Sequence, residues 1–250
     1  MSDYALLGAL FLFFRSYTFN TNLYLLLILK CLPVLLTSYS TYQKNKVMGY
    51  GFLFCAIGDL FLQLDDTLHY DLYFIIGLIS FLIGHHIFTI AFRLQKCNSI
   101  SPYAMIFRTV LLAIMILVLK PVVTAINLTG DSVLACAVVY YGCAIGLMAD
   151  ASYSVYYSYN NSYALYGSLI FVLSDSLLAF HKFVFELDFL GGTTAVLFTY
   201  YLAIGLLCRA TYELQPSSKQ HALVTCSWYY LLAGPGVGIG KLRKNNKFVR

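Results

Sequence analysis

Ionisable side chains interrupt several of the long apolar runs in this sequence. The stretch FLFCAIGDLFLQLDD, residues 52–66, places Asp59 deep inside such a run. Ionisable groups at membrane depth usually face the interior of a helix bundle, pair with one another and mark a functional site. When two carboxyl groups share one apolar cavity, one stays protonated and the other ionised, and acid–base catalysis needs this arrangement.

Four of the apolar runs carry a glycine, a small residue seven places later, and then an acid or a histidine. Seven residues make two helical turns, so the glycine and the small residue lie on one face, where helices approach closely. The four patterns are Gly51…Gly58-Asp59, Gly77…Gly84-His85, Gly142…Ala149-Asp150 and Gly167…Ser174-Asp175. We therefore expect the ionisable residues to lie at the edges of packed helix faces.

A lysine, an aspartate and a third ionisable residue recur at similar spacing about ninety residues further along the chain. The two series are Lys30, Asp59 and His85, and then Lys120, Asp150 and Asp175. Because the second series is displaced by three predicted helices, an odd number, a true internal repeat would be inverted in the membrane.

The depth of these residues along their helices defines the candidate site. With a rise of about 1.5 Å per residue, four of them fall roughly 7–12 Å inside the outer ends of their helices. These four are Lys30, Asp59, Lys120 and Asp175, and His85 lies nearer the midplane. We predict that they form one buried site. The alternative is that the lysine–aspartate pairs only neutralise each other and lock the bundle.

Other ionisable residues are predicted to lie outside that site. Asp150 is near a helix end, where its carboxylate can reach water. Structural roles are expected for His86 and His181, since neither has an apparent partner. The acids predicted to be loop charges are Asp65, Asp66, Asp71, Glu186 and Asp188.

The composition is that of a membrane protein. Of the 250 residues, 60% are hydrophobic and 11% charged, and the mean hydropathy is +0.75. Soluble domains have about 45–50% apolar and about 25% charged residues. Spanning the bilayer takes roughly 20 mostly apolar residues, and the segments that reach this length are about 22–40, 47–64, 69–92, 102–125, 132–153, 162–181 and 189–208. With a weaker segment at 4–20, the sequence predicts an all-α polytopic bundle of about eight transmembrane helices over residues 1–208.

The charges between these segments predict the orientation. Basic residues cluster in 43–46, 93–97 and the tail 209–250, whereas 64–71, Asp131 and 185–188 are acidic. The positive-inside rule then places both termini and the basic tail in the cytoplasm, and makes nucleic-acid binding by the tail a poor alternative. The histidines and cysteines show no metal-ligand spacing, so we expect neither a metal nor a cofactor.

Several motifs resemble those of the lysoplasmalogenases, the YhhN-like integral membrane hydrolases. They are GDLFL at 58–62, FIIGLISFLIGHHIFTIAF at 74–92, YGSLIFVLSDSLLAF at 166–180 and TYYLAIGLL at 199–207. The segment KCLP at 30–33 is similar to the family's Lys-Pro-rich motif, with Cys31 where a proline is common, and Ile204 stands where the family has a glutamine. The resemblance covers roughly residues 22–208.

The resemblance implies hydrolysis of the vinyl ether bond of 1-alkenyl lysophospholipids, to a fatty aldehyde and glycerophosphocholine or glycerophosphoethanolamine. By analogy with lipid metabolism it also implies a location in the endoplasmic reticulum membrane. The sequence leaves open the preferred head group, the side from which substrate enters, and whether the chain forms a homodimer.

The reaction needs a carboxylic acid to protonate the alkene and a carboxylate to stabilise the oxocarbenium ion, as in glycosidases. We assign Asp59 and Asp175 as this catalytic pair, without deciding which donates the proton. Lys30 is expected to hold the ionised partner or the phosphate, His85 to orient a carboxyl group or relay a proton, and Tyr200 to hydrogen-bond to substrate. The other residues of the predicted site are Lys120 and Ser174.

Two other classes of protein remain open. A small proton-coupled transporter would use the same intramembrane acids as an ion pathway, and an inverted repeat suits that class. A non-catalytic lipid-binding or scaffold protein would need these residues for stability alone.

Overall fold

The computed structural model describes residues 23–68, 71–95, 101–184 and 190–214, and all its regular elements are helices. They are α2 (Leu23–Tyr42), α3 (Lys46–Leu68), α4 (Asp71–Arg93), α5 (Ala104–Leu128), α6 (Ser132–Tyr159), α7 (Ser162–Phe183) and α8 (Leu190–Glu213). All seven predicted segments are therefore helices. The weaker segment at 4–20 lies outside the described residues, as does most of the predicted tail, although α8 continues past 208 to Glu213.

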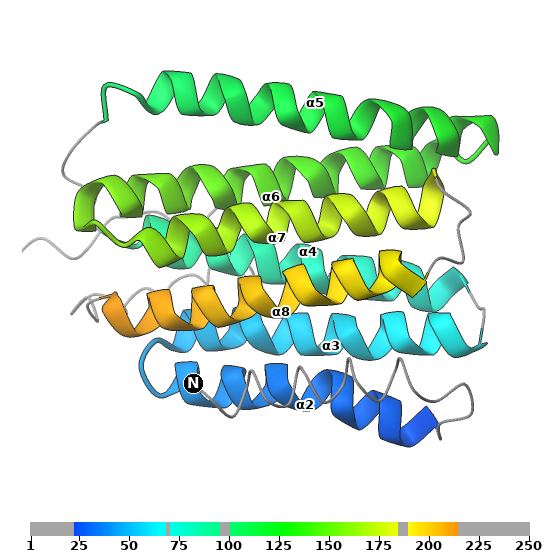
Figure 1. Ribbon diagram of the computed structural model, residues 1–250, viewed down its shortest axis with the longest axis horizontal. Helices are drawn as coiled ribbons and strands as arrows, with labels where there is room; N and C mark the ends of the chain where they lie inside the picture. Colours follow the sequence, from blue (N-terminus) through cyan, green and yellow to red (C-terminus); the bar gives the residue numbers. More distant parts are fainter. Residues whose placement is uncertain (1–22, 69–70, 96–100, 185–189, 215–250) are drawn as a thin grey trace, which may run out of the picture. The chain divides into compact units, whose positions relative to one another are not determined.

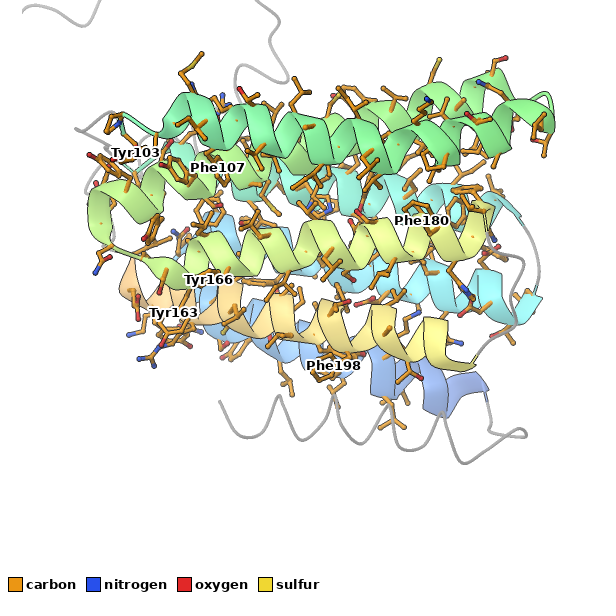
Figure 2. The ribbon with its side chains drawn as sticks, turned by 45° about the horizontal axis from the view of Figure 1, so that its top comes forward. Tyr103, Phe107, Tyr163, Tyr166, Phe180 and Phe198 are labelled. Atoms are coloured by element: carbon orange, nitrogen blue, oxygen red, sulfur yellow. The ribbon has the colours of Figure 1, made fainter. Side chains whose placement is uncertain are left out.

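Six of the described helices are long and apolar enough to cross a membrane. They are Lys46–Leu68, Leu72–Arg93, Ala104–Leu128, Ser132–Tyr159, Ser162–Phe183 and Thr194–Glu213. Large apolar side chains stay exposed on the outer faces, among them Tyr166 on α7 and Phe198 on α8 (Figure 2). Extensive exposed apolar surface is rare on soluble monomers. The chain is therefore a helical multi-pass membrane protein.

The helix contacts close into a ring of six helices. Along the ring α2 packs on α3, α3 on α4, α4 on α6, α6 on α7 and α7 on α8, and α8 returns to α2. Helix α5 packs on α6 and α7 from outside this ring, so that it runs along the opposite side of the bundle from α2 (Figure 1). Consecutive helices run antiparallel (Figure 1). Residues on the inner faces of the six ring helices can therefore meet, and residues of α5 are excluded from that interior.

Glycines bring α3 and α4 close together, as their spacing predicts. A Cβ atom on Gly84 would lie 3.2 Å from the carbonyl oxygen of Gly51, and one on Gly77 would lie 3.3 Å from that of Gly58. These distances leave room for hydrogen but not for a larger side chain, so the two backbones pack directly on each other. The small-residue face therefore fixes how far α3 and α4 are shifted along their axes relative to each other. It thereby also fixes the positions of the residues that follow Gly58 and Gly84.

Side-chain caps define the starts of α6 and α7. The Asp131 carboxylate accepts from the Leu134 backbone N–H at 2.9 Å, and the Asn161 side chain accepts from the Ala164 N–H at 3.1 Å. Each satisfies a donor that the first helical turn would otherwise leave unpaired. Asn161 also donates to the carbonyl of Ala210 at 3.1 Å. This bond joins the start of α7 to the end of α8.

Candidate functional site

A cavity of about 210 Å³ lies between α2, α3, α4, α7 and α8. Of the seven residues predicted to form the site, five line it, namely Lys30, Asp59, Ser174, Asp175 and Tyr200. His85 contacts one of these five, and Lys120 is not among the lining residues. The tertiary structure thus brings together residues from four helices that the sequence had related only by depth.

Asp59 lies on the inner face of α3 and is 2% exposed. Its Oδ2 atom accepts a hydrogen bond from the Tyr200 hydroxyl on α8 at 2.6 Å. The Tyr200 ring is held edge-on by Phe81 and Phe171, with ring centroids 5.9 and 5.5 Å away. The hydrogen bond from Tyr200 to substrate stays a prediction, and in this structure its hydroxyl orients a carboxyl group.

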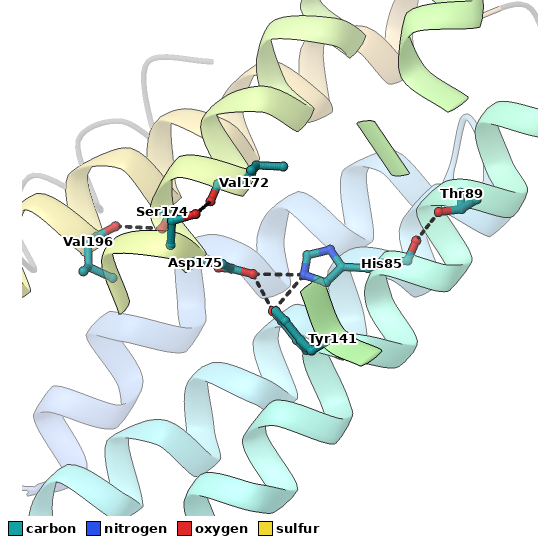
Figure 3. A network of polar contacts seen from close by, with 8 residues as sticks. His85, Thr89, Tyr141, Val172, Ser174, Asp175 and Val196 are labelled. Atoms are coloured by element: carbon teal, nitrogen blue, oxygen red, sulfur yellow. Dashed lines mark hydrogen bonds and ion pairs between the residues drawn. The ribbon is translucent and has the colours of Figure 1, made fainter. Parts of the chain in front are cut away.

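Asp175 on α7 receives two partners from two other helices. Its Oδ2 atom accepts from the Tyr141 hydroxyl on α6, and the same oxygen lies 3.2 Å from His85 Nε2 on α4. The Tyr141 oxygen and His85 Nε2 are themselves 2.9 Å apart, so the three groups form a closed triangle (Figure 3). The prediction that His85 contacts a carboxyl group agrees with this arrangement.

The hydrogen positions in this triangle follow from counting donors. The Tyr141 hydroxyl has one proton, which it gives to Asp175, and an ionised carboxylate only accepts. If Asp175 is ionised, His85 Nε2 carries the proton for its own contacts. The imidazole is fully buried, and its Nδ1 atom has no hydrogen-bond partner among the described residues. In that state two donors converge on one oxygen of Asp175.

Lys30 lines the same cavity from α2. Its side chain is buried, and none of the ion pairs formed among the described residues joins it to Asp59 or Asp175. The Tyr201 hydroxyl donates to the Lys30 backbone carbonyl at 3.1 Å, which holds α2 against α8. Direct lysine–aspartate neutralisation is therefore not what holds the two carboxyl groups. Tyrosine hydroxyls and an imidazole hold them instead.

Two members of the predicted series lie away from this cavity. Lys120 is exposed on α5, because that helix packs outside the ring. Asp150 forms an ion pair with Arg108, with 2.7 Å between Oδ1 and Nε. This ion pair lies toward the end of the bundle where α5 begins and α6 ends. Asp150 is not near a helix end as predicted, because α6 continues to Tyr159, and its carboxylate is paired with Arg108 instead. The idea of an inverted repeat stays a hypothesis. Of its matched pairs, His85 and Asp175 meet in the site, whereas Lys120 and Asp150 lie apart from Lys30 and Asp59.

Ser174 supports the site through the backbone of a neighbouring helix. Its hydroxyl donates to the carbonyl of Val196 on α8 at 3.1 Å (Figure 3). This bond fastens α7 to α8 directly beside Asp175, so Ser174 positions the carboxyl group rather than offering a nucleophile.

The prediction that Asp65 is a loop charge is wrong. Asp65 lies inside α3, lines the cavity near the end of that helix and forms an ion pair with Lys182 on α7, with 2.8 Å between Oδ2 and Nζ. The helix continues past the expected boundary at 64, so the acid points into the bundle about 1.7 turns beyond Asp59. Asp66 also lines the cavity and belongs to α3.

Tyr141 is the residue of the site that the sequence did not reveal. Tyrosine is abundant in the chain, with 22 residues, and at membrane helix ends it commonly forms interfacial belts. Its position in the sequence could have marked it as a site residue. Tyr141 directly precedes Gly142 in the small-residue pattern of α6, far from either helix end. A tyrosine at that depth needs a partner for its hydroxyl.

The chain was compared with known proteins. The searches of curated proteins and of solved structures gave no match. A family model does match, over residues 16–211, and it spans every helix that contributes to the cavity. The chain therefore belongs to the YhhN family, the family that contains lysoplasmalogenases.

Proposed function

We propose that this protein is a lysoplasmalogenase, which hydrolyses the vinyl ether bond of 1-alkenyl lysophospholipids. The observation that carries the proposal is a pair of carboxyl groups, Asp59 and Asp175, that line one intramembrane cavity with different hydrogen-bond partners. Vinyl ether hydrolysis needs two carboxyl groups in two protonation states, and unequal surroundings are how proteins separate them. Membership of the YhhN family is consistent with a hydrolase of this kind.

The unequal surroundings suggest which carboxyl group is the acid. Asp59 is the more buried of the two and meets one neutral hydroxyl, at Oδ2, so its Oδ1 atom is left to carry a proton. Asp175 accepts from two donors at a single oxygen and is partly exposed to the cavity. We therefore assign Asp59 as the proton donor and Asp175 as the carboxylate.

In the reaction, Asp59 gives its proton to the outer carbon of the alkene, and the electrons of the double bond form the new C–H bond. The ether oxygen shares the resulting positive charge, and the Asp175 carboxylate stabilises this oxocarbenium ion. Water then adds to the carbon that bears the oxygen and returns a proton to Asp59. The hemiacetal collapses to a fatty aldehyde and the free glycerol hydroxyl.

The surrounding residues position this pair. Tyr200 holds Asp59, and Tyr141 with His85 holds Asp175. Lys30 adds a positive charge to the cavity wall. The endoplasmic reticulum location and the cytoplasmic termini are part of the proposal and rest on the substrate class and on the loop charges.

The test is aldehyde release by purified protein in detergent. A 1-alkenyl lysophospholipid is offered beside its 1-acyl and 1-alkyl counterparts, and only the alkenyl lipid is expected to react. Asp59→Asn and Asp175→Asn each keep the side-chain shape and are expected to lower the rate by about 10²–10⁴-fold, the usual contribution of general acid–base catalysis.

Full turnover by either asparagine variant would overturn the assignment of the pair. If folded wild-type protein releases no aldehyde, and reconstituted vesicles take up an unchanged solute instead, the protein is a transporter and the two aspartates belong to its ion pathway.

A further inference from the structure

The cavity extends from the carboxyl pair to the end of the bundle where α3 and α7 end. At this end its wall contains Asp65 and Asp66 from α3, and His181 and Lys182 from α7. The cavity thus has two polar zones, one at Asp59 and Asp175 and one at its mouth. The apolar side chains of Leu62 and Leu178 line the wall between the zones. Proton transfer at the inner zone does not use the mouth residues, so their presence needs another explanation.

The two side chains of the ion pair at the mouth differ in their exposure. The Asp65 side chain is 8% exposed and the Lys182 side chain 37%. The Lys182 ammonium group also lies 4.7 Å from the centre of the Phe74 ring, a cation–π contact. An ammonium group has three protons and one contact to Asp65 engages one of them. The Lys182 ammonium group is therefore the more accessible member of the pair.

The spacing of the two zones matches the length of a phospholipid head group. Asp65 is six residues beyond Asp59 on α3, and Lys182 is seven beyond Asp175 on α7, which correspond to about 9 and 10.5 Å of helix rise. With bonds of about 1.5 Å, the five bonds from the ether oxygen to phosphorus extend about 6–7 Å, and the ammonium nitrogen lies about 5 Å further. A vinyl ether at the inner zone therefore places the phosphate and the ammonium group at the mouth.

We propose that the mouth binds the zwitterionic head group of the lysophospholipid, with the phosphate on Lys182 and the ammonium group on Asp65 and Asp66. The assignment rests on the proposed function. It also orients the substrate: the head group lies at the end of the bundle where α3 and α7 end, and the alkenyl chain points away from that end.

An exchange of partners explains why a zwitterion fits this mouth. In the free protein Asp65 and Lys182 neutralise each other. When a zwitterion binds, its phosphate pairs with Lys182 and its ammonium group pairs with Asp65, so that neither side chain of the ion pair is left without an opposite charge. A head group with phosphate alone would leave Asp65 buried without a cation, and an unpaired buried charge is strongly unfavourable. The mouth therefore selects zwitterionic over purely anionic or uncharged lysolipids.

The experiment measures binding without turnover. Three 1-O-alkyl ligands with the same chain are used, which lack the reactive double bond: the glycerophosphoethanolamine, the glycerophosphate and the uncharged glycerol ether. Their dissociation constants are measured on purified full-length protein in one detergent. Wild-type protein is expected to bind the glycerophosphoethanolamine at least about tenfold more tightly than the other two, since a hydrogen bond to a charged group contributes about 1.5–3 kcal/mol.

The variant that tests the site replaces the ion pair by an uncharged pair, Asp65→Asn together with Lys182→Met. Removing both charges avoids the cost of leaving one unpaired, so this protein is expected to fold, with its melting temperature as the check. It should bind the three ligands within about threefold of one another. Lys182→Arg keeps the charge and should keep the preference. Arg108→Met removes a cation from an ion pair of similar length near the opposite end, so it is the matched control and should bind like wild type.

Equal binding of the three ligands by wild-type protein, or an undiminished preference in the uncharged double variant, would overturn the head-group assignment. These outcomes are separable from failure of the proposed function. Asp59→Asn should lose aldehyde release but keep the head-group preference. A wild-type protein that shows the preference but releases no aldehyde from the alkenyl lipid would refute the hydrolase and leave a zwitterion-binding site.

Discussion

Replacing Tyr141 by phenylalanine removes one hydroxyl group and nothing else from the site. The ring of Tyr141 packs edge-on against His85, with centroids 5.3 Å apart, and phenylalanine keeps that contact. What is lost is the donor to Asp175 and the oxygen that lies 2.9 Å from His85 Nε2. Asp175 then keeps a single donor, and the imidazole loses one of the two atoms that fix its orientation.

The size of the effect follows from the charge on Asp175. A hydrogen bond to an ionised group is worth about 1.5–3 kcal/mol. If the carboxylate stabilises the oxocarbenium ion, this loss appears in the transition state, and each 1.36 kcal/mol is tenfold in rate. We therefore expect kcat/KM for aldehyde release to fall by about 10- to 150-fold in Tyr141→Phe. Initial rates on 1-alkenyl lysophospholipid measure it.

The adjacent residue supplies a matched control. Tyr140 is 57% exposed, and its hydroxyl lies 3.2 Å from His86 Nε2 rather than in the cavity. Tyr140→Phe makes the same chemical change one position away and is expected to leave kcat/KM within about twofold, as surface substitutions usually do. Wild-type activity in a folded Tyr141→Phe protein would refute the role of the triangle, and so would equal losses in the two variants.

Three further predictions follow from the same geometry. Lys30→Met removes the cation that lines the cavity from α2 and should lower kcat/KM at least about tenfold, whereas Lys120→Met, on the outer helix, should leave it within about twofold. Equal effects in aldehyde release would contradict the placement of α5 outside the ring. Tyr200→Phe removes the only hydroxyl that holds Asp59 among the described residues. It should lower kcat about tenfold with a smaller change in KM, because Asp59 reacts in the transition state. A rise in KM alone would mean that Tyr200 binds substrate instead. Gly84→Leu inserts a side chain where the α3 backbone packs. It should destabilise the protein by about 1–3 kcal/mol or more, measured as a lower melting temperature in detergent. An unchanged melting temperature would show that α3 and α4 are not in direct contact.

The helices of this protein are predictable because their signal is local. Each described helix corresponds to an apolar run of spanning length, and its ends fall within about six residues of the hydropathy boundaries. The small-residue spacing also predicts close-packing faces on α3 and α4, since two glycines seven residues apart must share a helix face, and in the structure these two faces meet. Depth along a helix is likewise a local quantity, and it singles out Asp59 and Asp175 as members of one site.

Rotation about the helix axis and the order of helices around the bundle are not local. Lys120 has the composition and the depth of a site residue, but α5 packs outside the ring, and its side chain is exposed. Asp65 shows the reverse case: beside Asp66 and Asp71 it resembles a loop acid, yet it is buried against Lys182, 117 residues away in the chain. Spacing within a segment carries no information about either outcome.

The partners of the two carboxyl groups are likewise decided by the tertiary structure. Hydropathy and charge mark Asp59 and Asp175 from the sequence alone, because an acid in an apolar run is costly unless it is paired. Their partners Tyr200 and Tyr141 are two of 22 tyrosines and carry no such mark. The sequence by itself therefore determined the membrane helices and the acids at their core. Only the packing of the ring, which brings side chains from distant helices within hydrogen-bond distance, decided what those acids meet and which charges are left outside.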